Sequence, residues 1–150
     1  MWSAESVVVC ALTLLGRTQA QFPAIQFVDK APAYVSRLAQ AYIQDPDARI
    51  VLVTSTSAFA RARRAAFECS EVEAIREIAG VLAHEEWHVL HGADEEAAYD
   101  AQLTALLYVG ADQNGALYHK IMQAKQAVTR RSSRAGVLAS ATSSVRVPPP

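Results

Sequence analysis

The chain has no apolar run long enough to cross a membrane. Its 150 residues are 51% hydrophobic, but the apolar run at residues 7–15 falls well short of the roughly twenty residues that a spanning helix needs. Aromatic residues make up only 7% and charged residues 19% of the chain, with a formal net charge of -1. This balance excludes a wholly disordered chain and favours one globular domain with a single core.

Acidic residues are absent after Asp112. The basic residues of the same stretch are Lys120, Lys125, Arg130, Arg131, Arg134 and Arg146. A basic end can bind nucleic acid or acidic lipid, but no aromatic residue is interleaved here to stack on bases. We therefore expect residues 129–150, which end in three prolines, to be a disordered, solvated tail, and we expect no nucleic-acid partner.

Cysteine is scarce, occurring only at Cys10 and Cys69. Residues 1–20 combine an apolar run with small residues at the spacing that a signal peptidase recognises. They predict a signal peptide cut near Ala20 and a secreted or periplasmic bacterial protein. No Lys or Arg precedes the run, so the alternative is a buried N-terminal segment. Cleavage would leave Cys69 as a single buried thiol, with no intramolecular disulfide.

Residues 21–128 predict one α+β domain, mostly helical with a small sheet. Residues 23–28 alternate between apolar and polar, and residues 49–56 are β-branched and apolar, so both segments predict strands. Apolar residues at helical spacing, with suitable end signals, predict helices over 32–43, 59–67, 70–91, 95–109 and 116–128.

Histidine is rare as well, yet three of the four histidines fall within residues 84–91. His84-Glu85-Glu86-Trp87-His88 has the form HExxH. On a helix, positions i and i+4 share one face, so both imidazoles can bind one metal ion while Glu85 reaches a water on it. Catalytic zinc sites use three protein ligands and one water. The motif therefore predicts bound Zn²⁺, with Glu85 accepting a proton from the zinc-bound water and passing it to a leaving amine.

The third ligand is expected from the helix that follows. Gly92 can close the motif helix in a left-handed conformation, and Asp94 can cap the next one. Because the connection is so short, the chain must double back, which brings Glu95 or Glu96 close to His88. Asp94 is also within reach, so the residues leave these three carboxylates open.

The motif with a downstream Glu resembles the gluzincin group of zinc metallopeptidases. The block HEEWHVLHGADEEAAYDAQL is similar to small bacterial secreted members, and the resemblance covers roughly residues 70–110. It implies a minimal zincin-like domain in which an active-site helix is followed by a second helix carrying the third ligand. It also implies a sheet whose edge strand, here residues 49–56, holds a peptide or protein substrate.

The resemblance makes the motif histidines zinc ligands and Glu85 the general base of a small peptidase. It favours Glu95 as third ligand, because the wider block carries Asp-Glu in that register. Glu96 is the alternative, since Asp100 follows it four residues later. Asp100 would then orient a metal-binding imidazole by accepting a hydrogen bond from it, without binding the metal itself.

Further residues were candidates for the site on weaker grounds. Tyr118, and after it His119, lies downstream where a donor could stabilise the oxyanion of a tetrahedral intermediate. His91 shares the face of the motif histidines but stands where the metzincin pattern HExxHxxGxxH requires Gly, so that pattern fits less well. A zinc-stabilised binding domain without turnover is the alternative to an enzyme.

Overall fold

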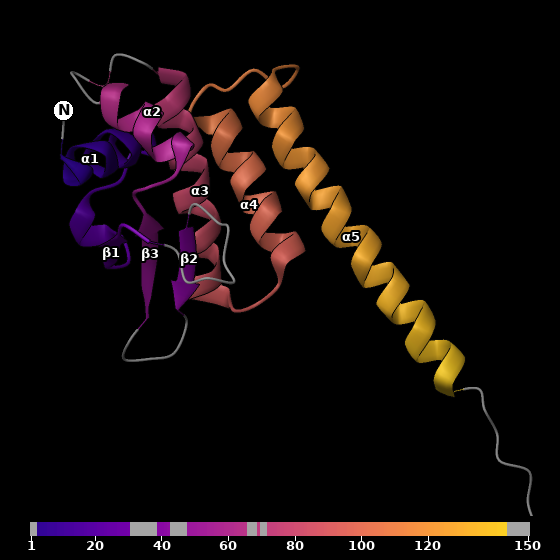
Figure 1. Cartoon of the computed structure of the whole chain (residues 1–150). Coiled ribbons are helices and arrows are strands. Elements are labelled where there is room, and N and C mark those ends of the chain that lie inside the picture. Colours follow the sequence, from indigo (N-terminus) through magenta and orange to yellow (C-terminus); the bar gives the residue numbers. More distant parts are fainter. Residues whose placement is uncertain (1–2, 31–38, 43–47, 66–68, 70–71, 144–150) are drawn as a thin grey trace, which may run out of the picture.

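The computed structural model describes residues 3–30, 39–42, 48–65, 69 and 72–143. These residues form an α+β arrangement, mostly helical with one small sheet, which confirms the predicted fold class at that level (Figure 1). The elements are α1 (Ala4–Leu14), a 3-10 turn (Gln19–Gln21), β1 (Ile25–Val28), β2 (Ala39–Tyr42), β3 (Arg49–Val53), α2 (Ser57–Ala65), α3 (Val72–His91), α4 (Glu95–Tyr108) and α5 (Ala116–Ser143).

The sheet has three strands in the order β1-β3-β2. β3 pairs in parallel with β1, where Ile25 faces Ile50, and antiparallel with β2, where Ala39 faces Leu52. The strands predicted at 23–28 and 49–56 are confirmed, but the expectation that the second lies at the edge is wrong. Its side chains are buried from Ile50 to Val53, as suits a continuous apolar run with a neighbour on each side.

The helix predicted over residues 32–43 is also corrected, because Ala39–Tyr42 is the edge strand β2. Backbone pairing with β3 takes precedence there over a helical spacing of apolar residues, since local patterns yield to tertiary context. The rest of that predicted helix lies outside the described residues.

α1 belongs to the core of the domain. Val7, Val8, Ala11 and Leu12 on this helix are at most 2% exposed, and Cys10 forms a disulfide with Cys69, 59 residues later. Cys69 is therefore not a free thiol while residues 1–20 are present, and the single thiol was expected only after their removal, which would take away α1 and the disulfide. Cleavage near Ala20 stays a prediction, and its site falls within the 3-10 turn Gln19–Gln21.

The disulfide is compatible with an extracellular protein, because such bonds persist in oxidising compartments. None of the described helices is both long enough and apolar enough to cross a membrane.

α3 is the central helix. It packs against α1, α2 and the sheet on one side and against α4 on the other, and α4 in turn contacts α5 (Figure 1). Ile75, Ile78 and Leu82 of α3 are fully buried. A smaller apolar cluster, made by Leu103, Leu106, Ala111 and Ile121, joins α4 to α5.

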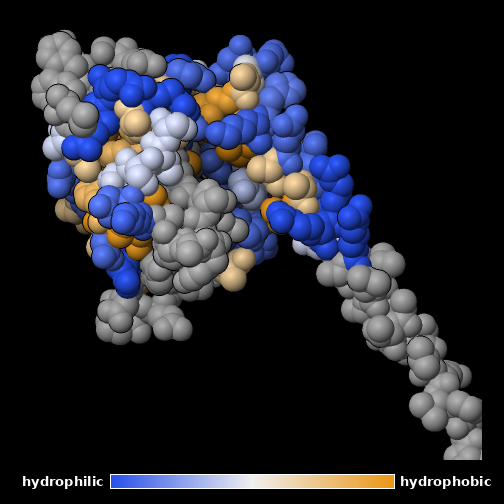
Figure 2. Space-filling view, in the orientation of Figure 1, coloured by the Kyte–Doolittle hydropathy of each residue, from blue (hydrophilic) through white to orange (hydrophobic). Residues whose placement is uncertain are grey.

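α5 continues well beyond Val128, where the sequence predicted its end. It runs to Ser143, so residues 129–143 are helical rather than disordered, and residues 144–150 lie outside the described part. The extension is rich in Ala and Arg, which favour helices, and has no proline before residue 148. The C-terminal half of α5 extends beyond the end of α4 and projects from the rest of the domain (Figure 1). Where its side chains are described, the surface seen in Figure 2 is mostly hydrophilic.

Candidate metal centre

The site begins with the tight connection between α3 and α4. Gly92 has φ +110°, a conformation that favours glycine, and its amide donates to the carbonyl of His88 at 2.9 Å. Asp94 then caps α4 by accepting a hydrogen bond from the Ala97 amide at 3.1 Å. Both predicted end signals are confirmed, and Glu95 becomes the first residue of α4 beside the last turn of α3.

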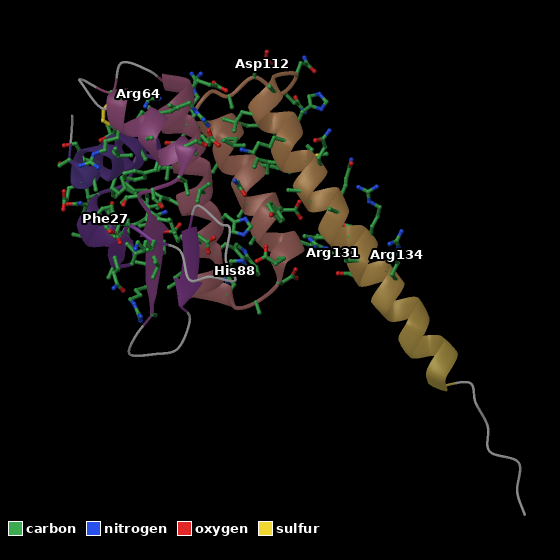
Figure 3. All side chains as sticks on the ribbon, in the orientation of Figure 1. Phe27, Arg64, His88, Asp112, Arg131 and Arg134 are labelled. Atoms are coloured by element: carbon green, nitrogen blue, oxygen red, sulfur yellow. A yellow bond between two sulfur atoms is a disulfide. The ribbon has the colours of Figure 1, made fainter. Side chains whose placement is uncertain are left out.

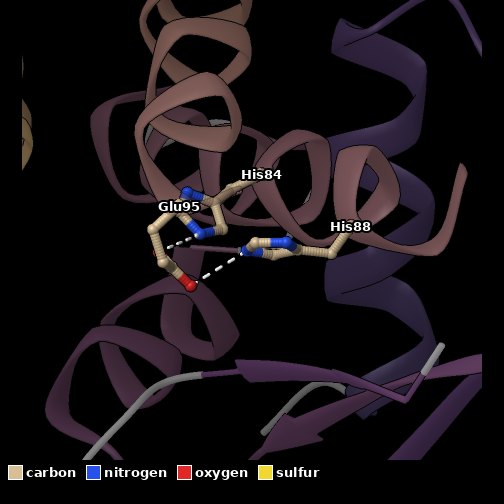
Figure 4. A group of neighbouring side chains, drawn as sticks. All are labelled: His84, His88 and Glu95. Carbon is tan, nitrogen blue, oxygen red and sulfur yellow. Dashed lines mark hydrogen bonds and ion pairs between the residues drawn. The ribbon is translucent and has the colours of Figure 1, made fainter. Parts of the chain in front are cut away.

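His84, His88 and Glu95 come together in a compact group (Figure 4). The Nε2 atom of His84 lies 3.2 Å from Oε2 of Glu95, and Nε2 of His88 lies 3.0 Å from Oε1. A tetrahedral ion bound at roughly 2.0–2.1 Å separates its ligand atoms by about 3.3 Å. The three side chains are therefore spaced to hold one metal ion, as the sequence predicted for this set.

The burial of the group is uneven. His84 is 6% exposed and His88 7%, whereas the Glu95 side chain is 29% exposed. Figure 3 places His88 at the end of α3, where the chain turns toward α4. The imidazoles are thus buried within the fold, while the carboxylate that faces them is partly open to solvent.

Both imidazoles are held through their other ring nitrogen. Nδ1 of His84 lies 3.0 Å from Oε1 of the buried Gln102, and Nδ1 of His88 lies 2.7 Å from the carbonyl oxygen of Gly92. Because both partners are acceptors, Nδ1 donates and the Nε2 lone pair points at the Glu95 carboxylate. Lone pairs facing each other at this distance need a cation between them, either a proton or a metal ion.

Gln102 takes the supporting role that the sequence assigned to Asp100. Asp100 is exposed and forms an ion pair with Lys125 of α5, and its hydrogen bond raises the pKa of that lysine. On α4, residues 95, 99 and 102 share one face, whereas residue 100 is rotated toward α5. The spacing of seven residues between Glu95 and Gln102 was the signal that could have identified the glutamine.

The other two candidate carboxylates do not join the group. The Asp94 side chain is engaged in capping α4. Glu96 is turned toward α5, where its charge contributes to raising the pKa of Lys125. Among the described residues, His84, His88 and Glu95 are the group whose ligand atoms lie within 4.8 Å of one another.

Glu85 opens onto the same cavity as the metal-binding group. The cavity has a volume of about 380 Å³ and is lined by His84, Glu85, Glu95 and Tyr99, with the turn before α2 and one face of α5 as its other walls. Glu85 is only 6% exposed. A carboxylate outside the three-residue group therefore shares a sheltered space with it.

Tyr99, not Tyr118, is the tyrosine at the site. The ring of Tyr99 meets the His84 ring edge to face, with the centroids 4.6 Å apart. Tyr118 packs instead against the apolar cluster between α4 and α5, and His119 is exposed on α5. The structure therefore does not bring the predicted oxyanion donors to the cavity, whose lining on α5 consists of Lys120, Ile121 and Ala124.

His91 lies apart from the group as well. Its ring packs against Trp87, with the centroids 5.0 Å apart, and both line a separate cavity with Leu90 and Tyr108. One further turn of α3 thus carries His91 off the face of the two ligand histidines.

Comparison with known proteins gives no relative for this arrangement. No protein-family model, characterised protein or solved structure matches the chain.

Proposed function

We propose that this protein is a zinc-dependent hydrolase, and specifically a small peptidase of gluzincin type. His84, His88 and Glu95 hold Zn²⁺, and Glu85 is the general base. The observation that carries the proposal is the shared cavity: the buried Glu85 carboxylate lies outside the three-residue group, yet it lines the same cavity as two members of that group, His84 and Glu95.

The donor set suits zinc. Two imidazole nitrogens and one carboxylate oxygen are common ligands of catalytic zinc, and three protein ligands leave a position for water or substrate. When bound, zinc supplies a Lewis acid that polarises a substrate carbonyl and makes a water more acidic.

The chain's own residues carry the proton transfers and fix the geometry. Glu85 accepts a proton from the attacking water and delivers it to the leaving amine. Gln102 and the Gly92 carbonyl hold the two imidazoles in the tautomer that presents Nε2. Tyr99 limits the movement of the His84 ring from the side.

A zincin-like fold is part of the proposal. Supporting it are a motif helix that packs against the sheet and a return helix that supplies the third ligand. β2 is the edge strand beside α3, so we place the substrate strand there rather than at residues 49–56. A secreted or periplasmic location agrees with the disulfide.

A zinc-stabilised binding domain without turnover is less well supported. Such a site would fill its fourth position with a protein ligand, and the sequence offers His91 for this position because it shares the face of the motif histidines. His91 instead packs on Trp87 in a different cavity.

The proposal is tested by Glu85→Gln. This change removes the proton acceptor but keeps the shape of the side chain, so bound zinc should remain while peptide hydrolysis falls by roughly 10²-fold to 10⁴-fold. Metal content and turnover are measured on the same preparation. Glu86→Gln is the matched control, because Glu86 pairs with Arg17 and lines the other cavity. Hydrolysis by Glu85→Gln at the parent's rate would remove Glu85 from the mechanism.

A further inference from the structure

An ion-paired bridge crosses one end of the catalytic cavity. Glu77 of α3 lies 3.1 Å from a guanidinium nitrogen of Arg61 on α2 and 3.1 Å from Nζ of Lys120 on α5. We call these three residues the Glu77 bridge. It joins the helices on both sides of the groove above α3.

The bridge separates two hollows. Glu77 and Lys120 line the cavity that contains Glu85 and the metal-binding group. All three bridge residues also line a second cavity of about 380 Å³ between α2, α3 and α5. The bridge therefore closes what would otherwise be one continuous groove along α3.

The distance from the metal-binding group to the bridge limits the length of substrate that fits between them. Glu77 precedes His84 by seven residues, which is two helical turns or about 10 Å along α3. An extended peptide advances about 3.3 Å per residue. The space between them thus accommodates about three residues of an extended substrate.

The charges of the bridge indicate which chemical group of a substrate could bind beside it. Two cations surround one carboxylate, and that carboxylate is the sheltered member: the Glu77 side chain is 14% exposed, against 45% for Arg61 and 66% for Lys120. The ammonium of Lys120, which lines the cavity and is the more exposed partner, is thus open to a second carboxylate arriving along the cavity. A substrate carboxylate suits this end of the cavity, since charge-assisted hydrogen bonds between an ammonium and a carboxylate are strong.

The bridge can stabilise the fold and also shape the groove. Pairs between exposed cations and a carboxylate contribute little to folding, because solvent screens them and the long side chains lose freedom. The position of the bridge across the groove, by contrast, has a direct consequence for what the groove can bind.

We propose that the Glu77 bridge determines substrate specificity: it ends the cleft about three residues from the scissile bond, and Lys120 binds a substrate carboxylate there. The inference rests on the proposed peptidase function and adds a substrate class to it. The carboxylate is either the C-terminus of a peptide or an acidic side chain at the corresponding position.

Binding tests the charge preference without turnover. Zinc-loaded Glu85→Gln is titrated by calorimetry with N-acetylated alanine peptides of two to eight residues. Each peptide is prepared with a free C-terminal carboxylate, with an amide, or as an amide whose last residue is Glu. We expect at least tenfold tighter binding of a carboxylate form than of the plain amide. The two carboxylate forms distinguish a terminal from a side-chain source.

Lys120→Gln, placed in the Glu85→Gln background, should reduce that preference to less than twofold. Lys125→Gln is the matched control, because Lys125 lies on the same helix but pairs with Asp100 and is absent from the cavity lining. Equal affinity for carboxylate and amide, or a preference that survives Lys120→Gln, would overturn the inference. Melting temperature and zinc content establish that both variants are folded.

Cleavage products test the length limit. The active enzyme should release fragments of at most three residues from the carboxylate end, and Glu77→Ala should release longer ones as the two hollows merge. Turnover without any charge or length preference would refute the inference and leave the peptidase function standing. Charge-dependent binding with no turnover in the parent would refute the peptidase function and leave the carboxylate-binding role of Lys120 standing.

Discussion

Individual side chains around the two histidines show how a metal site is built from its supports. Gln102 and the Gly92 carbonyl each accept from an imidazole Nδ1, which leaves Nε2 directed at Glu95. Neither support is part of HExxH. The motif supplies the ligands, and the residues behind them decide which atom each ligand presents.

Gln102→Ala should therefore weaken zinc binding by roughly 10-fold to 100-fold, the range found when supporting partners of ligand histidines are removed. Competition with a chromogenic chelator measures the affinity. Asp100→Ala is the matched control on the same helix, since Asp100 contacts Lys125 rather than a ligand. If Asp100→Ala weakened binding as much as Gln102→Ala, the support would have been assigned to the wrong residue.

At the residue scale, the sequence predicted that the two motif histidines and Glu85 lie close together, because HExxH places them on a helix with fixed spacing. It favoured Glu95 over Glu96 and Asp94 only by the register of the surrounding block. Asp100 and Tyr118 lie away from the site because each has another partner: Asp100 pairs with Lys125, and Tyr118 packs against the apolar cluster between α4 and α5. Which residue a side chain contacts is set by how these two helices pack, and the spacing of residues in the sequence does not show it.

Among the elements, α1 departs most from the sequence prediction. A short apolar N-terminal run suits both a signal peptide and a core helix, because each requires the same composition. Val7, Val8 and Leu12 bury that run against the core, and a disulfide joins Cys10 of α1 to Cys69, three residues before α3 begins.

The disulfide should contribute roughly 2–4 kcal/mol to stability, because it closes a long loop in the unfolded chain. Cys10→Ser, Cys69→Ser and the double variant are compared by urea denaturation. We expect all three to lose the same free energy of unfolding, since either single change already breaks the bond. A double variant markedly less stable than both singles would mean that the cysteines act independently.

For the molecule as a whole, the candidate metal site lies between two helices that are consecutive in the chain and pack directly on each other. α3 carries the histidines and packs on α1, α2 and the sheet, whereas α4 carries Glu95 and packs on α5. An ion bound there would add a further link between α3 and α4, and its binding free energy would add to the stability of the folded state.

Removal of zinc should accordingly lower the melting temperature. By linkage, free metal at 100 times its dissociation constant adds about 2.7 kcal/mol, which corresponds to several degrees for a domain of this size. Calorimetry with and without a chelator measures the shift, and His88→Ala should abolish it. His119→Ala, an exposed histidine on α5, should retain it. A chelator-independent melting temperature, with no metal in the purified protein, would support a metal-free scaffold instead.

The sequence by itself determined the mixed fold class, most helix positions and ends, and the set of residues competent for metal chemistry. These properties depend on local spacing, capping and side-chain type, which the order of residues fixes. Only the tertiary structure decided that β3 is central, that α1 lies in the core, that Gln102 supports His84 and that Glu77 pairs with both Arg61 and Lys120. Each of these depends on contacts between segments far apart in the chain, and the energy of such contacts is set by how the helices and strands pack.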